Sequence, residues 1–88
     1  MLTDRRIAIV IPALNEAEAL PGVHDALPRE LAAVIVADNG STDRTAELAR
    51  RHGATVVHEP RRGYGAACLA GLRAVEAIRP SIDIVVFM

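Results

Sequence analysis

The stretch "AVIVADNGSTDRTAELARRHG", residues 33–53, carries the signals of a strand, a turn and a helix in immediate succession. It begins with five aliphatic residues that do not alternate with polar ones, a pattern typical of a strand covered on both faces of a parallel sheet. The dipeptide Asn39-Gly40 permits a tight turn, the hydroxyls that follow it can cap a helix over Asp43–His52, and Gly53 can end that helix. The stretch therefore predicts a β–α unit with a polar turn at the carboxyl end of its strand.

The same apolar pattern occurs three more times, over Ile7–Ile11, Ala54–Val57 and Ile82–Met88. Residues of helical composition and spacing separate these runs, over Ala17–Leu27 and Gly65–Arg79. Strands and helices thus alternate along the whole chain. With right-handed crossovers, this order predicts an α/β fold of three layers, helices on both faces of a mostly parallel sheet.

Length and composition narrow the classes of partner. The chain has 88 residues, enough for one domain at most, and its net charge of -1 gives no long-range attraction for nucleic acid or an anionic membrane. Tyr64 and Phe87 are the only aromatic residues, which argues against a stacking platform for single-stranded nucleic acid. A small-molecule partner is therefore favoured.

The single cysteine and the N-terminal stretch indicate the compartment. Cys68 has no partner for an intrachain disulfide or a cysteine metal cluster, which fits a reducing compartment, and we expect it to be a small buried residue. The stretch "MLTDRR" precedes too short an apolar segment to be a signal peptide or a membrane span. We therefore expect a cytoplasmic chain.

The C-terminal run "IDIVVFM" ends inside or at the very end of a predicted strand. A strand edge left open in this way is a liability that complete domains usually cover. We therefore expect residues 1–88 to be the incomplete front part of one larger domain, interrupted after its fourth strand. The uncovered residues Ile84–Phe87 also predict self-association, which is the alternative explanation of the open edge.

Three polar loops follow the first three predicted strands, where ligands bind in parallel α/β sheets. They contain "IPALNE" at 11–16, "ADNGSTD" at 37–43 and "PRRGYGAA" at 60–67. Pro12 cannot donate a ladder bond, so we expect it to end the first strand and to leave backbone groups available to a flat ligand. The carboxylate of Asp38 can accept hydrogen bonds from a base or from sugar hydroxyls, although it can also simply cap the turn.

The first and third loops add complementary chemistry. Glu16 places a carboxylate in the loop at the end of the first strand. Alternatively, it is a solvated acid in the first turn of a helix. Gly63 and Gly65 permit close backbone approach at a helix N-terminus, where an anion is favoured. Arg62 adds a cation that can pair with phosphate oxygens. A diphosphate is the ligand that this loop suggests. Asp43 and Thr45, by contrast, are expected to have structural roles.

Taken together, "IVIPALNEAEAL", "VIVADNGSTDRTAELA" and "EPRRGYGAACLAGLRA" resemble the opening of a family 2 glycosyltransferase with the GT-A fold, whose nucleotide-binding half is Rossmann-like. The match covers nearly the whole chain, and its glycine-rich third motif is most similar to the branch of dolichyl- and polyprenyl-phosphate sugar transferases. The resemblance implies a nucleotide-diphosphate sugar donor of the UDP or GDP type, with a polyprenyl phosphate among the acceptors. For the full-length protein it adds the inner face of the membrane as an alternative location.

The resemblance also implies roles for particular positions. Asp38 resembles the acid that contacts the base, the first-loop residues resemble those that line the ribose and base, and the glycine loop resembles the one near the diphosphate. Asn39 departs from the aspartate that many members carry there, which puts a second carboxylate role in doubt. The implied nucleotide-binding residues are Pro12, Ala13, Glu16, Asp38, Arg62, Gly63 and Gly65.

The family's metal-binding motif, two acids flanking one residue, follows the strand that "IDIVVFM" resembles. Mg²⁺ or Mn²⁺ is therefore expected in the full-length enzyme, with most of its ligands beyond Met88, and no metal ligand is expected within the chain. No catalytic residue is expected here either, so the 88 residues alone are predicted to be inactive. The histidines His24, His52 and His58 lack the spacing of metal ligands and are expected to be structural.

Other classes of function fit the sequence less well. A non-catalytic nucleotide-binding or self-associating α/β module is the main alternative. A dinucleotide-dependent oxidoreductase is disfavoured because the first strand leads into "IPALNE" and not into G-x-G-x-x-G. A sugar nucleotidyltransferase is disfavoured because no glycine-rich loop follows that strand.

Overall fold

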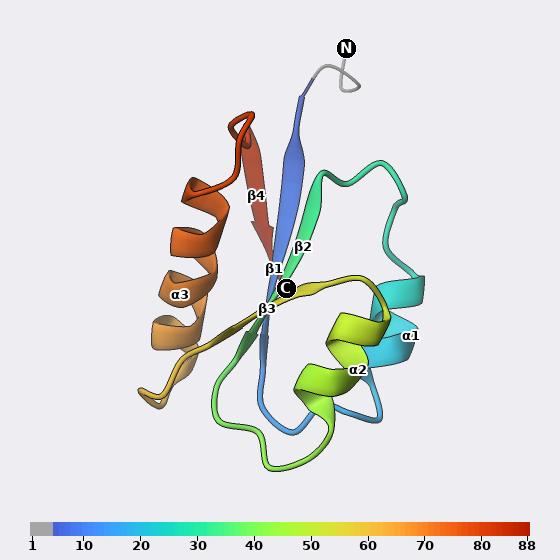
Figure 1. Ribbon diagram of the computed structural model, residues 1–88, viewed down its shortest axis with the longest axis vertical. Coiled ribbons are helices and arrows are strands. Elements are labelled where there is room, and N and C mark those ends of the chain that lie inside the picture. Colours follow the sequence, from blue (N-terminus) through green and yellow to red (C-terminus); the bar gives the residue numbers. More distant parts are fainter. Residues whose placement is uncertain (1–4) are drawn as a thin grey trace.

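The computed structural model describes residues 5–88, so the first four residues of "MLTDRR", and the expectation made for them, lie outside it. The described chain alternates strands and helices in the predicted order (Figure 1). The elements are β1 (Ile7–Ala13), α1 (Leu20–Asp25), β2 (Ala33–Asp38), α2 (Thr45–Arg51), β3 (Thr55–His58), α3 (Tyr64–Glu76) and β4 (Ile84–Phe87).

The four strands form one sheet in the order β3-β2-β1-β4, and every neighbouring pair is parallel. Ala13 lies opposite Asp38, and Asp38 lies opposite His58, so β1, β2 and β3 end at the same edge of the sheet. The chain moves outward from β1 to β3 and then returns through α3 to place β4 on the other side of β1. Such a reversal of strand order is where α/β sheets bind ligands, beyond the carboxyl ends of the strands.

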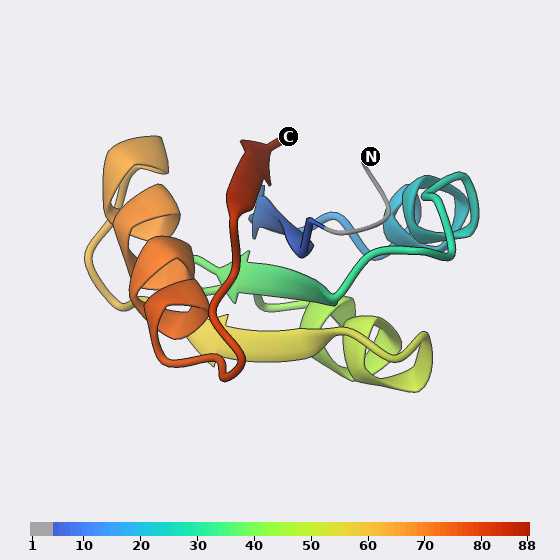
Figure 2. The ribbon, with the colours of Figure 1, turned by 90° about the horizontal axis from the view of Figure 1, so that it is seen from above.

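Helices cover both faces of the sheet, which confirms the predicted three layers of an α/β/α fold. Figures 1 and 2 show α3 on one face and α1 and α2 on the other. The residues of β1 alternate between the two cores: Ala8 and Val10 pack with Val75 of α3, whereas Ile9 and Ile11 pack with Leu20 of α1. Both faces of β1 are buried, as its continuous apolar sequence predicts.

Close approach of α3 to the sheet depends on Gly71. A Cβ atom at this position would lie 2.3 Å from Cγ1 of Val10, a side chain with no exposed surface. Because Val10 is branched at Cβ and enclosed, it has no room to move aside. Gly71 therefore sets how closely α3 packs on β1.

The predicted end of the first strand is wrong. Pro12 does not end β1, which continues through it to Ala13. Val10 O accepts a hydrogen bond from Met88 N, and Ala13 O accepts one from Asn39 N. Since alternate residues face alternate neighbours, Pro12 faces the β4 side, past the last β4 pairing, so its missing N–H removes no bond to β2.

The first helix is shorter than predicted. It begins at Leu20 and not at Ala17, which places Pro21 in its first turn, where the missing N–H removes no helical bond. The residues before it bond to the loop after β2. The last strand begins at Ile84 and not at Ile82, since the carboxylate of Asp83 accepts a hydrogen bond from Arg6 N just before the strand.

Over residues 5–88, no helix combines the length and hydropathy needed to cross a membrane.

Candidate functional site

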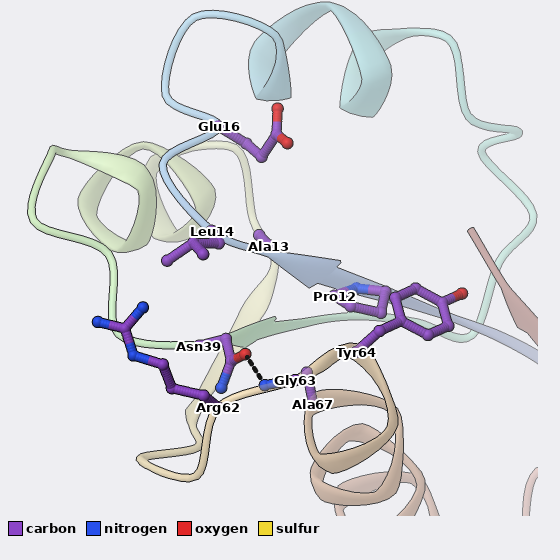
Figure 3. Close-up of a pocket in the computed structure, with 9 residues that line it drawn as sticks. All are labelled: Pro12, Ala13, Leu14, Glu16, Asn39, Arg62, Gly63, Tyr64 and Ala67. Carbon is purple, nitrogen blue, oxygen red and sulfur yellow. Dashed lines mark hydrogen bonds between the residues drawn. The ribbon is translucent and has the colours of Figure 1, made fainter.

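A pocket of about 410 Å³ opens at the carboxyl end of β1, among the loops that follow β1, β2 and β3. Figure 3 shows side chains from all three loops around this opening. Its walls combine apolar side chains near β1 with polar and cationic groups near α3. The lining residues are Pro12, Ala13, Leu14, Glu16, Asn39, Arg62, Gly63, Tyr64 and Ala67.

The loop after β2 holds the loop after β1 in place. Ser41 Oγ accepts a hydrogen bond from Asn15 N at 2.9 Å, and Asn15 Oδ1 accepts one from Thr42 N at 2.9 Å. Asn15 has a φ of 52°, a left-handed conformation that asparagine tolerates better than most residues. These reciprocal bonds fix the turn that carries Leu14 and Glu16 to the pocket.

Thr45 and Asp43 extend this link. Thr45 is completely buried, and its Oγ1 accepts a hydrogen bond from Glu16 N at 2.9 Å while its hydroxyl donates to the carboxylate of Asp43. Asp43 also accepts a hydrogen bond from Ala17 N at 3.2 Å. The Thr45 hydroxyl, together with the backbone N–H groups of Thr45 and Ala17, lowers the pKa of Asp43 below its usual value. The structural roles expected of both residues are thus found, and they serve the loop after β1 as well as α2.

Asn39 holds the third loop. Its Nδ2 donates to Glu59 O at 2.9 Å and to Arg61 O at 2.7 Å, and its Oδ1 accepts a hydrogen bond from Gly63 N at 3.0 Å (Figure 3). The middle loop of the site therefore ties both of the others. The polar residues of "ADNGSTD" bond mainly to the backbone of neighbouring loops.

Gly63 immediately precedes α3 and has a φ of 121°, which a residue with a side chain rarely adopts. The first intrahelical bond of this turn runs from Ala67 N to Gly63 O at 3.2 Å, so the N–H groups of the three residues between them have no partner inside the helix. Arg62, which is exposed, lies immediately before this N-terminus. The α3 side of the pocket is consequently the side that favours an anion.

Asp38 lies beneath the pocket and not in its wall. The residue is 4% exposed, its Oδ1 accepts a hydrogen bond from Ser41 N at 3.3 Å, and its Oδ2 lies 3.3 Å from Nδ1 of His58. Nε2 of His58 lies 3.1 Å from the Arg50 guanidinium, which can only donate. His58 therefore accepts at Nε2 and donates from Nδ1 to Asp38, a role of this histidine in the site that the sequence did not indicate.

Five of the seven residues predicted to bind a nucleotide line the pocket together: Pro12, Ala13, Glu16, Arg62 and Gly63. Asp38 and Gly65 do not line it, although Asp38 is the strand partner of Ala13. Sequence reasoning missed Leu14, Asn39, Tyr64 and Ala67 as lining residues.

Tyr64 carries the one signal that sequence reasoning could have used, a lone aromatic residue between two glycines. It is 63% exposed at the pocket, and the neighbouring Cys68 thiol raises the pKa of its phenol. Cys68 itself is half-buried, and not fully buried as expected.

The described residues do not fit a divalent metal. Within residues 5–88 no group of three or more His, Cys, Asp or Glu side chains is placed to hold an ion. Glu16 is a single carboxylate at the pocket, and Asp38 does not line it. Glu59 is buried and accepts a hydrogen bond from Arg61 N at 2.8 Å. No chemical step through a metal is therefore derived for these residues.

Comparison with known proteins decides the family. The family model described as glycosyl transferase family 2 matches residues 8–88, which include all three loops of the pocket. The chain belongs to glycosyltransferase family 2.

Among curated proteins, this family 2 chain is 54% identical over 68 residues to an uncharacterized glycosyltransferase of Mycobacterium tuberculosis, covering 77% of this chain and 31% of the relative. It is 37% identical over 70 residues to a dolichyl-phosphate hexose transferase of Haloferax volcanii, again covering 77% of this chain and 31% of the relative. The chain thus spans about a third of the length of the curated relatives it matches.

Solved structures agree with the fold of this family 2 chain. Glucosyl-3-phosphoglycerate synthase from Mycobacterium tuberculosis, in complex with Mn²⁺, UDP and glucosyl-3-phosphoglycerate, matches with a TM-score of 0.79 and 35% identity, over 99% of this chain and 34% of that one. A complex of the same enzyme with Mn²⁺, UDP-glucose and phosphoglyceric acid gives a TM-score of 0.81 with 35% identity, over 99% of this chain and 33% of that one. The Rossmann-like half of a GT-A fold is confirmed by these matches.

Proposed function

We propose that this chain forms the donor-binding part of a glycosyltransferase that takes its sugar from a nucleotide diphosphate of the uridine type. The observation that carries the proposal is the joining of three loops, by hydrogen bonds from the middle one, around a single pocket. UDP and UDP-glucose in the complexes of glucosyl-3-phosphoglycerate synthase favour uridine over the guanosine alternative.

The chemistry of the pocket suggests how such a donor lies. The diphosphate belongs beside Arg62 and the N-terminus of α3, where a guanidinium and unbonded N–H groups face its negative charge. The base and ribose belong on the other side, against Pro12 and Ala13 with Glu16 as a hydrogen-bond acceptor. A base contact for Asp38 stays part of the proposal, because its carboxylate keeps acceptor sites beyond those used by Ser41 and His58.

The acceptor, the metal and the chemistry belong to the same proposal. We take a polyprenyl phosphate as the specific candidate acceptor, supported by the likeness to a dolichyl-phosphate hexose transferase. A divalent metal, present with UDP in the related synthase, would find its ligands outside residues 5–88 and would neutralise the leaving diphosphate. Residues 1–88 would then be one portion of a single transferase domain, inactive alone, in the cytoplasm or at the inner face of a membrane.

One observation favours the alternative of a self-associating module. Val86 and Phe87, on the edge strand β4, are 42% and 43% exposed. An open edge with apolar side chains is suited to pairing with another strand. Self-association through β4 therefore stays a prediction alongside nucleotide binding.

Calorimetric titration of the protein with UDP and GDP tests the proposed function. We expect UDP to bind more tightly than GDP, and Arg62→Ala to weaken UDP binding by about tenfold or more, the effect of losing a hydrogen bond to a charged group. Arg73→Ala is the matched control, because Arg73 is exposed in the last turn of the same helix. Absence of UDP binding, or an equal loss in both variants, would contradict the proposal.

A further inference from the structure

We propose that Asn39 is a positioning residue that fixes the diphosphate side of the pocket through the amide of its side chain. The inference deepens the proposed donor site and rests on it. Asn39 lies at the junction of β2 and the middle loop, where its backbone N donates to Ala13 O at 2.9 Å. Its side chain reaches in the other direction, to the loop that carries Arg62 and Gly63.

The amide uses all of its hydrogen-bonding groups on that one loop. Both protons of Nδ2 go to carbonyl oxygens, those of Glu59 and Arg61, and Oδ1 accepts from Gly63 N. These partners are alternate residues of the chain, so the loop wraps around the amide. Arg62 lies between two neighbours that are both held by Asn39. A single side chain thereby sets where the cation and the start of α3 lie.

Other residues of the loop also stabilise the path of its backbone. Glu59 is 8% exposed, and its Oε2 accepts a hydrogen bond from Arg61 N at 2.8 Å. Gly63 takes a φ of 121°, which lets its N–H point back to Asn39 as α3 begins. The path is therefore determined from inside by Glu59 and Gly63. A backbone bond from Glu59 N to Asp38 O at 2.9 Å attaches the start of the loop to the sheet edge, and the side chain of Asn39 attaches the residues that follow.

Only an amide can make this set of bonds. An aspartate at position 39 has nearly the same shape, but its carboxylate has no proton to donate and would face the two carbonyl oxygens of Glu59 and Arg61. It could keep only the bond from Gly63 N. We expect the loop to move away from the carboxylate and to take Arg62 and the N-terminus of α3 with it.

The opposite side of the pocket does not depend on Asn39 in this way. Asn15 and Glu16 are held by Ser41 and Thr45 through separate hydrogen bonds. Loss of the Asn39 amide should consequently remove the binding contributed by the diphosphate and leave the binding contributed by the nucleoside. A general loss of structure would instead lower both contributions together.

The test compares affinities for UDP and uridine, measured by NMR titration of the labelled protein. In Asn39→Asp we expect the preference for UDP over uridine to fall about tenfold or more, with uridine affinity within about twofold of the unchanged protein. Asn39→Ala should lose the same preference without adding a negative charge. Gly63→Ala, which disturbs the same loop from the other end, should do likewise, whereas Glu76→Gln at the far end of α3 should not.

Each outcome decides the inference. An unchanged preference in Asn39→Ala would overturn it, and so would an equal fall in UDP and uridine affinity. If Asn39→Asp does not give a folded amide spectrum, Asn39→Ala and Gly63→Ala carry the same comparison. Failure of the unchanged protein to bind UDP would overturn the proposed function itself, and the inference with it.

Discussion

Replacing Thr45 by valine removes one hydroxyl from the centre of the loop network and changes little else. Valine keeps the branched shape that fills this completely buried position. What is lost is the acceptor for Glu16 N, which lies 2.9 Å from Oγ1, and the donor to Asp43. Thr45→Val therefore tests whether the start of α2 supports the turn that carries Glu16.

The magnitude follows from leaving a partly buried N–H without its acceptor, which costs about 1–3 kcal/mol in the free energy of unfolding. In urea, with a slope of about 1 kcal/mol per M for a protein of this size, the midpoint should fall by roughly 1–3 M. The matched control is Thr55→Val, the same chemical change at an exposed position of β3. It should alter the free energy of unfolding by less than about 0.5 kcal/mol.

A second measurement locates the effect. Hydrogen exchange of the Glu16 amide should become faster in Thr45→Val and stay unchanged in Thr55→Val, because only the first substitution removes its acceptor. Equal urea midpoints for the two variants, with equal protection of the Glu16 amide, would refute the assigned role of the hydroxyl.

Four further predictions concern packing, pH, binding and assembly. Gly71→Ala should lower the free energy of unfolding by about 1–3 kcal/mol through overpacking against Val10, with partial recovery when Val10→Ala is added; a stability gain in the single variant would contradict the packing. Because hydrogen bonds lower the pKa of Asp43, its contribution to stability should be complete above the usual carboxyl range and be lost as pH falls through the lowered value; NMR titration showing an ordinary or raised value would refute this. Asp38→Ala should weaken UDP binding by about 1–3 kcal/mol in calorimetry, whereas unchanged affinity would exclude the base contact. Sedimentation should reveal self-association through β4, and a monomer at all concentrations would count against it.

The order of elements could be predicted because each strand is a continuous apolar run bounded by turn residues. The boundaries depend on neighbours that the local sequence does not reveal. Pro12 was expected to end β1, but its effect depends on which strand its nitrogen faces, and it faces a position past the last β4 pairing. The helix expected from Ala17 begins only at Leu20, and the residues before it bond to side chains 26 positions away.

The site could be predicted to a similar extent. The glycine-rich loop and the neighbouring arginine follow from backbone freedom and charge, and both Arg62 and Gly63 line the pocket. The polarity of the middle loop was also evident, but the partners of its side chains were not. Asn39 shows why, since its amide bonds to residues 20 to 24 positions away that the fold alone brings beside it.

NMR titration of the labelled protein with UDP tests most directly whether three loops form one donor site. The account predicts saturable shift changes for the backbone amides of Glu16, Asn39 and Gly63, one from each of the three loops that line the pocket. Amides near His24 and His52, at a separate depression of the surface, should not respond. Changes gathered around those histidines, or no saturable change at any of the three loops, would contradict the account.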